Sequence, residues 1–385
     1  MLRIEGSYGK PLSNATISLL ESLVKIPSIC GDEYNIAEFT RKWLVEHGLS
    51  AEMTDVKPRR PNVVCRLKGR KEGPGLLLNG HMDTVAVGGG WTRDPFGAEI
   101  EGERMYGRGT IDMKSGLAAI LVAATECMHE GLPEKGELIV TAVVDEESID
   151  LGTYALIQQG VTKGVDLAMV SEATDLNVVN AHRGRTVFDI EVRGRAAHSM
   201  WPEHGVSAIE GAARLITELP ELYSPNHPRL GRDTMNVLKI EGGQEDVMLV
   251  PEHCRMVVDR CLVPGDNSKN ALDALNHLIK TIGVDASAKL IFRETPFCEP
   301  FEISENDERV RIVTEAATKV LGRRPKLDYH PGPCDSCILV TPGGIPTLEF
   351  GPSGGRLHES DEFVELNSVR KTTEVYKEVI RAMLS

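Results

Sequence analysis

The residues with the clearest chemistry begin at His81, which ends an apolar run predicted to be a strand, and Asp83 follows two positions later. Because alternate residues of an extended segment share a face, Asp83 can lie behind His81 and accept its second ring N–H. Such a partner fixes the tautomer of a metal-bound histidine. The alternative interpretation is a single histidine in the turn that ends a strand.

Four carboxylates follow at comparable places, one at the entry to a helix and three at the ends of apolar strands: Asp112, Glu146, Glu147 and Glu172. The helix is predicted over 115–124 and the strands over 137–144 and 165–170. Adjacent acids repel one another unless a cation neutralises them. Since sites in open α/β sheets gather at the carboxyl ends of the strands, we expect these acids to converge on His81. A helix cap and a solvated acidic turn are the alternatives.

The elements that must position these residues alternate between helical and strand patterns. The predicted helices are 13–27, 33–48, 115–124, 151–159, 307–321 and 366–383. The predicted strands are 62–67, 75–80, 137–144, 165–170 and 347–350. This alternation predicts the α/β class, with a mixed sheet flanked by helices.

A different pattern begins near residue 183. It reads as a strand, a helix, two strands, a helix and a strand, over 186–192, 205–218, 235–242, 253–262, 267–283 and 287–293. The order βαββαβ is that of a ferredoxin-like unit. After residue 296 the pattern of the larger domain resumes. We therefore predict a catalytic domain over 1–182 and 297–385, with an inserted domain over 183–296.

The amino-acid composition indicates which kinds of binding partner do not suit this protein's surface charge. The 385 residues are 41% hydrophobic and 26% charged, which is ordinary for a globular protein. The 43 basic and 57 acidic residues give a net charge of −14, and the absence of a basic block argues against nucleic acid or an anionic membrane as partner. The first eight residues have no apolar signal region, and no run reaches about 18 apolar residues. We expect a soluble, cytoplasmic protein.

Eight cysteines scattered over this length do not resemble a disulfide framework. Cys334 and Cys337 have CxxC spacing, which can signal redox or zinc chemistry. No second CxxC and no nearby histidine pair completes a zinc site in the sequence, so we interpret the pair as incidental. Four histidines have no evident partners and are predicted to be surface or packing residues: His182, His204, His253 and His330.

A second candidate histidine ligand, His358, lies in a glycine-rich loop after strand 347–350. Imidazoles and carboxylates together suit zinc, with cobalt or manganese as substitutes. Two metals sharing one bridging carboxylate would use five ligands and hold a water whose pKa they lower. One leftover carboxylate is then needed as proton shuttle. Adjacent residues of an extended chain point opposite ways, so Glu146 and Glu147 can divide these roles.

These motifs resemble the di-zinc amidohydrolase family of acetylornithine deacetylase, succinyl-diaminopimelate desuccinylase, aminoacylase and glutamate carboxypeptidase, over essentially the whole chain. The matching segments are His-Met-Asp-Thr-Val, Tyr-Gly-Arg-Gly-Thr-Ile-Asp-Met-Lys, Asp-Glu-Glu, Ser-Glu-Ala and two loops, at 81–85, 106–114, 145–147, 171–173, 194–202 and 350–362. The family members bind two Zn2+, for which Co2+ or Mn2+ can substitute.

The resemblance implies a role for each matching position. The implied metal ligands are His81, Asp112, Glu147, Glu172 and His358, with Asp112 as the bridge and a cis peptide bond after it. Glu146 is implied as the general base and Asp83 as the carboxylate behind His81. His198 resembles the histidine that reaches into a partner subunit's site and helps to hold the oxyanion, which implies a homodimer formed through the inserted domain.

The implied reaction is hydrolysis of the amide bond of an N-acyl-L-amino acid by a metal-bridged hydroxide, as in acetylornithine deacetylase and succinyl-diaminopimelate desuccinylase. Asn236 and Arg260 lie where the family holds the substrate carboxylate, and the alternative for Arg260 is a solvated residue on a strand face. A dipeptidase or C-terminal glutamate carboxypeptidase acting on short peptides is the alternative within the family. A metal-binding regulatory protein without turnover is the alternative from another class.

Overall fold

The computed structural model describes residues 13–385, except 225, 245–247 and 292–297. Its elements form two compact units. Within the described residues, the larger unit comprises the chain up to Asn180, Ile303–Asp328 and Ile338–Ser385, and the smaller comprises Ala181–Glu302 and Tyr329–Cys337. The first twelve residues, the last part of the predicted strand 287–293 and the predicted domain boundary at 296 lie outside the described residues.

The larger unit is built on a mixed sheet, which confirms the predicted α/β class. Its strands run in the order β1 (Ala51–Lys57), β2 (Arg60–Lys68), β6 (Lys135–Val143), β3 (Lys71–His81), β7 (Leu167–Val170), β15 (Thr347–Glu349) and β8 (Val178–His182), and β8 also pairs with β13 (Phe301–Glu302) and β14 (Leu327–His330). β3 lies parallel to β6 and β7, with His81 opposite Val143 and Asn79 opposite Val170. The carboxyl ends of these three strands therefore meet at one edge.

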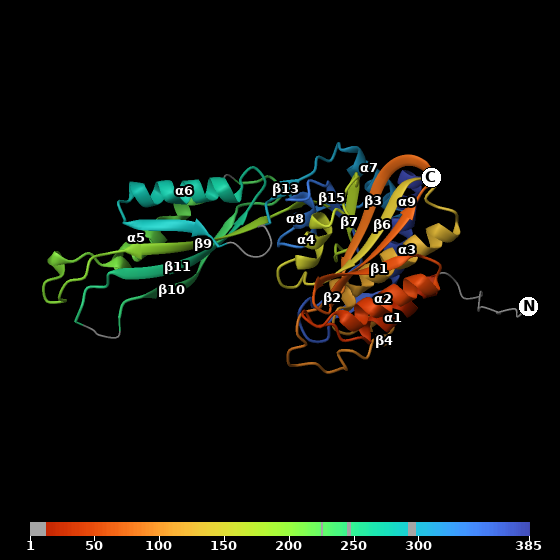
Figure 1. The fold of residues 1–385 in the computed structure, drawn as a ribbon, viewed down its shortest axis with the longest axis horizontal. Helices are drawn as coiled ribbons and strands as arrows, with labels where there is room; N and C mark the ends of the chain where they lie inside the picture. The colour runs from red at the N-terminus through yellow and green to blue at the C-terminus, as the bar shows by residue number, and fades with distance from the viewer. Residues whose placement is uncertain (1–12, 225, 245–247, 292–297) are drawn as a thin grey trace, which may run out of the picture. The chain divides into compact units, whose positions relative to one another are not determined.

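Alternate residues of β3 pack on opposite faces of this sheet, as the period of a strand requires. Leu76 and Leu78 join the main core, to which α1 (Ser13–Val24), α3 (Ser115–His129) and α9 (Leu366–Leu384) contribute. Leu77 joins a second cluster with Leu156 of α4 (Leu151–Gln158). Figure 1 shows α3 and α9 beside the strands β3 and β6. Since each buried leucine contributes about 2 kcal/mol, these layers hold the strand ends in place.

The larger unit also contains the helices α2 (Tyr34–Glu46) and α7 (Glu308–Leu321). A short helix, α8, covers Asp335–Val340. Among the helices of the described residues, none has both the length and the apolar character needed to cross a membrane.

A small four-stranded sheet connects two distant segments of the larger unit. Its order is β16 (Gly354–Gly355), β17 (Phe363–Glu365), β5 (Arg104–Tyr106) and β4 (Glu99–Glu101). The antiparallel register places Phe363 opposite Tyr106. Because His358 lies between β16 and β17 and Asp112 follows β5, this pairing brings the two predicted ligands into one region.

The smaller unit has the predicted βαββαβ order: β9 (Gly184–Arg193), α5 (Ala208–Glu218), β10 (Thr234–Gly242), β11 (His253–Leu262), α6 (Ser268–Thr281) and β12 (Ala286–Leu290). Its antiparallel sheet runs β10-β11-β9-β12. Leu215 of α5 and Leu275 of α6 pack with Ile190 of β9 in one core, and Figure 1 shows this helix and strand arrangement. Ser207 and Asn267 cap the two helices through their side chains.

Candidate metal centre

The carboxylate of Asp112 lies between two histidines. Its Oδ1 is 3.1 Å from His81 Nε2 and its Oδ2 is 3.0 Å from His358 Nε2. His81 is the last residue of β3, and Asp112 lies in the turn before α3, where the Asp112–Met113 peptide bond is cis, as expected. One carboxylate that faces a different imidazole with each oxygen has the geometry of a bridge between two cations.

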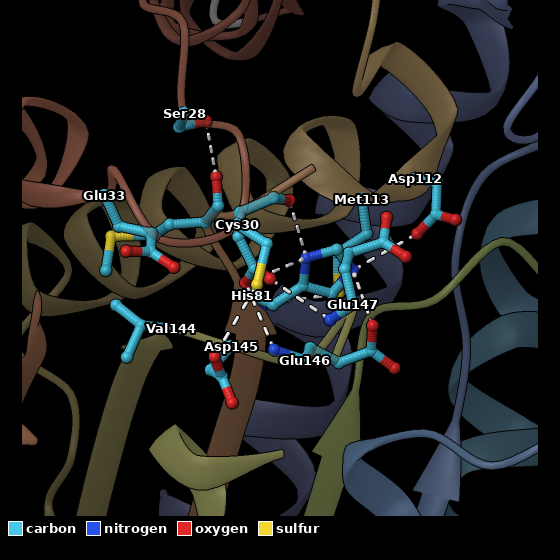
Figure 2. A network of polar contacts seen from close by, with 12 residues as sticks. Ser28, Cys30, Glu33, His81, Asp112, Met113, Val144, Asp145, Glu146 and Glu147 are labelled. Carbon is cyan, nitrogen blue, oxygen red and sulfur yellow. Dashed lines mark hydrogen bonds and ion pairs between the residues drawn. The ribbon is translucent and has the colours of Figure 1, made fainter. Parts of the chain in front are cut away.

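Each histidine has a second acid beside it. Glu172 Oε1, just after β7, is 3.5 Å from His81 Nε2. Glu147 Oε2, just after β6, is 3.1 Å from His358 Nε2. The structure thus brings the five predicted ligands together as two sets that share Asp112. Figure 2 shows the His81 ring at the centre of this network with Asp112 beside it.

Glu146 lies next to this cluster, with its Oε2 3.8 Å from His81 Nε2. The residue before it, Asp145, has a left-handed backbone with a φ of 69°. This tight turn follows directly on β6 and separates two acids that are adjacent in the sequence: Glu147 faces His358, whereas Glu146 faces His81. The predicted division of the two glutamates between different tasks is therefore geometrically available.

The support behind His81 differs in one respect from the prediction. His81 Nδ1 is 2.9 Å from the backbone carbonyl oxygen of Asp83 and 3.7 Å from its carboxylate. The carboxylate instead accepts the backbone N–H groups of Glu146 (3.3 Å) and Glu147 (3.1 Å). Nδ1 still carries a proton, because the carbonyl can only accept one, and Nε2 is the ring nitrogen that faces the acids.

A second polar network holds the turn that carries the two glutamates. Arg60 pairs with Glu33 and places its Nη2 2.6 Å from Asp145 Oδ1, while Cys30 Sγ lies 3.6 Å from the same oxygen. Figure 2 shows Glu33, Cys30 and Asp145 around this point. Sequence reasoning missed Arg60 and Glu33, since neither stands in a distinctive local pattern.

Glu362 plays the corresponding part for Asp112. Its buried carboxylate pairs with the buried guanidinium of Arg108 and accepts the backbone N–H groups of Gly109 (3.1 Å), Ile111 (3.0 Å) and Asp112 (3.3 Å). These bonds fix the backbone on which the bridging carboxylate stands. Sequence reasoning missed this pair as well, although both residues lie within the segments that carry the family resemblance.

The charges of the cluster favour cations. Hydrogen bonds to Asp112 and Glu147 raise the pKa of His358 to about 10, and burial raises the pKa of Asp83 to about 7. Burial opposes ionisation of Asp112, but the hydrogen bonds with His358 and His81 keep its pKa below the ordinary value. Glu147 Oε1 is buried and has no hydrogen-bond partner among the described residues. An acid-rich set of N and O donors with an unused buried oxygen fits divalent metal ions.

The three other predicted site residues belong to the smaller unit. His198 is exposed, and its Nδ1 accepts the backbone N–H of Met200 (3.1 Å). Asn236 is exposed on β10. Arg260 is buried and donates from Nε to Asp233 Oδ2 (2.9 Å). The alternative interpretation of Arg260 as a solvated strand-face residue is therefore wrong.

The CxxC pair lies beside His182, for which the sequence indicated no partner. Cys334 Sγ lies 3.3 Å from His182 Nε2, and Cys337 Sγ lies 3.4 Å from His182 Nδ1. His330 also lies within this group. His182 lies 152 residues before Cys334, so the spacing along the chain gave no sign of their contact.

The ends of three parallel strands, with two imidazoles and four further carboxylates around a shared aspartate, define the site of a metal-dependent hydrolase. Residues 77–382 match the profile of "Peptidase family M20/M25/M40". The chain therefore belongs to this family of metallohydrolases and is an enzyme of the amidohydrolase and metallopeptidase type.

Individual relatives agree with this assignment. The chain is 34% identical over 392 residues to a Peptidase M20 domain-containing protein of Schizosaccharomyces pombe, covering 96% of this chain and 85% of that protein. It is 28% identical to a succinyl-diaminopimelate desuccinylase of Cereibacter sphaeroides, covering 95% and 98%. Its fold matches that of a dinuclear metal-binding M20 peptidase of Bacillus subtilis, with a TM-score of 0.76, 17% identity and coverage of 97% and 98%.

Proposed function

We propose that this protein is a di-zinc hydrolase that cleaves the amide bond of an N-acyl-L-amino acid and releases an amino acid and a small carboxylate. One observation carries the proposal: the two oxygens of Asp112 lie 3.1 Å and 3.0 Å from two histidines, each with its own second carboxylate. The acyl-amino-acid substrate is supported by the desuccinylase relative and by family membership.

In this proposal His81 and Glu172 would hold one metal, His358 and Glu147 would hold the other, and Asp112 would serve both. Zinc suits these borderline N and O donors, and Co2+ or Mn2+ can replace it. Two bound metals would supply Lewis acidity at the amide carbonyl and lower the pKa of a bound water.

Glu146 is the carboxylate left over from this ligand set, and we assign it the proton transfers. Its Oε2 is 3.8 Å from His81 Nε2, at the margin of the cluster. From there Glu146 takes a proton from the attacking water and delivers it to the leaving nitrogen. Asp83 acts as a positioning residue, because its carboxylate holds the backbone amides of Glu146 and Glu147.

We further propose that residues 183–296 form a dimerisation and lid domain inserted into the catalytic domain of 1–182 and 297–385. β10 ends the order of the small sheet in the described part of the chain, and its Leu238 and Ile240 are 57% and 50% exposed. An exposed apolar edge strand is a ready surface for a second copy. The exposed His198 would then serve the partner's site by helping to hold the oxyanion.

The dimer proposal has a direct test. A His198→Ala chain and a Glu146→Gln chain should each be nearly inactive. If His198 acts across the dimer, mixing the two after dissociation restores part of the activity, because a mixed dimer contains one intact site. Mixtures that form mixed dimers and stay inactive would refute the shared site.

Asn236 and Arg260 are proposed to hold the substrate carboxylate. Arg260 pairs with Asp233, which fixes the orientation of its guanidinium group and neutralises part of its positive charge. Arg260→Lys should raise KM for an N-acyl amino acid, because lysine cannot reproduce a bidentate grip, while an analogue with the carboxylate amidated should be unaffected. Arg255→Lys, on the same strand, serves as the control.

Activity measurements can distinguish the proposed deacylase from a peptidase and from a regulatory protein without turnover. The Bacillus subtilis structure is that of a peptidase, which supports a dipeptidase or carboxypeptidase as the second candidate. A panel of acetyl-, succinyl- and peptidyl-amino acids with zinc or cobalt decides between them. Metal-dependent hydrolysis that a chelator abolishes supports the enzyme, and Glu146→Gln controls for a contaminant. A chain that binds both metals but hydrolyses nothing in the panel would favour a regulatory protein.

A further inference from the structure

The smaller unit contains a second group of metal-ligating side chains that shares no residue with the metal centre. His182 ends β8 and is fully buried, His330 ends β14, and the buried Cys334 lies just before α8. The candidate ligand atoms of these three residues lie within 4.8 Å of one another. Their chemistry also differs from that of the metal centre, because a cysteine sulfur is among the candidate ligands.

The contacts of His182 indicate which of its ring nitrogens faces Cys334. Its Nδ1 lies 3.3 Å from the backbone carbonyl oxygen of Arg183, which can only accept a proton. Nδ1 therefore carries the hydrogen, and Nε2 presents its lone pair toward Cys334 Sγ at 3.3 Å. A carbonyl behind the ring is the usual support of a metal-binding histidine.

The spacing suits a tetrahedral ion. Zinc binds imidazole nitrogen at about 2.0–2.1 Å and thiolate sulfur at about 2.3 Å, which places two such ligands about 3.5 Å apart. The separation of His182 Nε2 and Cys334 Sγ is 3.3 Å. The ring centroids of His182 and His330 are 4.7 Å apart, and the candidate ligand atoms of the two residues lie within 4.8 Å of each other.

We propose that His182, His330 and Cys334 form a second metal site that binds a thiophilic divalent cation, with zinc as the preferred ion. The candidate ligand atom of His330 lies within 4.8 Å of those of Cys334 and His182, so the group is larger than one thiol–imidazole pair. Three side chains leave one coordination position of a tetrahedral ion for a further ligand. Because His182 is distant in the sequence from His330 and Cys334, the metal would cross-link β8 to the stretch between β14 and α8.

A neighbouring cysteine pair is not needed for this site. Cys298 and Cys337 form a disulfide whose Cα atoms are 5.0 Å apart. Cys337 Sγ lies 3.4 Å from His182 Nδ1, the nitrogen that already faces a carbonyl. The pair is thus on the protonated side of the ring, and Cys334 is the sulfur assigned as ligand.

Cobalt titration of the full-length, metal-free protein tests the proposal. Thiolate-bound Co2+ has a charge-transfer absorption in the near ultraviolet that nitrogen and oxygen ligands do not produce. The wild type should develop this absorption and bind one cobalt more per chain than the Cys334→Ser variant. Cys254→Ser, which replaces another buried cysteine of the smaller unit, should behave as the wild type.

Three further variants separate the outcomes. His358→Ala should lose metal from the other centre but keep the absorption, so failure of one site is distinguishable from failure of the other. A Cys298→Ser/Cys337→Ser double variant should also keep it, which assigns the sulfur to Cys334. His330→Gln should lose the extra metal with every cysteine intact, a control against misfolding of Cys334→Ser. Wild type without the absorption at any cobalt level, or an unchanged absorption in Cys334→Ser, would overturn the proposal.

Discussion

The carboxylate of Asp83 accepts a hydrogen bond from the backbone N–H of Glu147, with Oδ2 3.1 Å from that nitrogen. Its other oxygen lies 3.3 Å from the backbone nitrogen of Glu146. One acid after β3 therefore fixes the turn after β6, on which both the proposed base and a proposed ligand stand. The ends of β3 and β6 are therefore linked by the hydrogen bonds of the Asp83 side chain as well as by the backbone pairing of the sheet.

Removing this acid should misplace both glutamates. Asp83→Ala is expected to lower kcat by about 10- to 100-fold and to weaken metal binding, because two backbone amides lose their acceptor. Steady-state kinetics together with the zinc content per chain measure the effect. A variant with normal kcat and full zinc content would show that the turn holds without Asp83.

Glu146→Gln should lower kcat by about 10³-fold, because the amide cannot take up a proton. Zinc content and thermal stability should stay near the wild-type values, since Glu146 is not assigned as a ligand. Glu99→Gln, an exposed acid on β4, provides the control for a lost surface charge. Substantial turnover by the Glu146→Gln enzyme would refute the base assignment.

Loss of the bridge should differ from loss of one terminal ligand. Asp112→Ala is expected to abolish retention of both metals, whereas His358→Ala should spare the site of His81 and Glu172. Metal analysis after gel filtration gives the number of ions retained by each variant. Equal loss in the two variants would mean that Asp112 is not shared.

Gly351 is predicted to be essential to the position of Glu172. A Cβ at residue 351 would lie 2.0 Å from the backbone oxygen of Glu172, and backbone can relieve such a contact only by moving. Gly351→Ala should therefore reduce metal retention as well as thermal stability. Gly89→Ala is the matched control, because nothing lies within 4 Å of the added Cβ there. Equal metal content in the two variants would contradict the prediction.

Asp189 should give the smaller unit an acid-sensitive component of stability. Hydrogen bonds from Arg255 and Lys289 hold the pKa of this carboxyl below its ordinary value. A lowered folded-state pKa stabilises above the unfolded value of about 4, and that stability is lost as pH falls through the folded value. Because Arg255 is about half exposed, solvent screens the pair and Asp189→Asn should cost only about 1 kcal/mol at pH 7.

Urea unfolding at about pH 7 and about pH 3 measures this difference. The gap between wild type and Asp189→Asn should shrink at the lower pH, because about pH 3 lies below the unfolded-state pKa of about 4 and part of the stabilisation is then lost. Asp285→Asn, an exposed acid 3.9 Å from Arg193, should change stability little at either pH. A gap that persists at low pH would assign the stabilisation to packing.

The sequence predicted those site residues that stand at the end of a strand or the start of a helix with a clear hydrophobic pattern. His81, Asp112, Glu147 and Glu172 each stand at the end of an apolar strand or the entry to a helix, so a coarse reading of the elements placed them at one sheet edge. The βαββαβ order of the smaller unit followed from hydrophobic periodicity. The first helix ends at Val24, earlier than the predicted residue 27.

The features that the sequence did not predict are mostly contacts between residues that are distant along the chain. Arg108 and Glu362 form a buried ion pair across 254 residues, and neither position has a local signal for it. The contact of His182 with Cys334 spans 152 residues. β1 was missed because it is an edge strand whose side chains are mostly half-exposed and polar, so its apolar alternation is weak.

The small sheet that pairs β17 with β5 also has a consequence for biosynthesis. Asp112 is made long before His358, and the backbone on which Asp112 stands is held by Glu362. While residues 354–365 are still inside the ribosome, a nascent chain has neither the imidazole of His358 nor the carboxylate of Glu362 in place. Because Glu362 holds the backbone of Asp112, Asp112 is not yet positioned either. Loading with metal would thus be a late, post-synthetic event, and an incomplete chain would have no hydrolytic activity to expose to the cell.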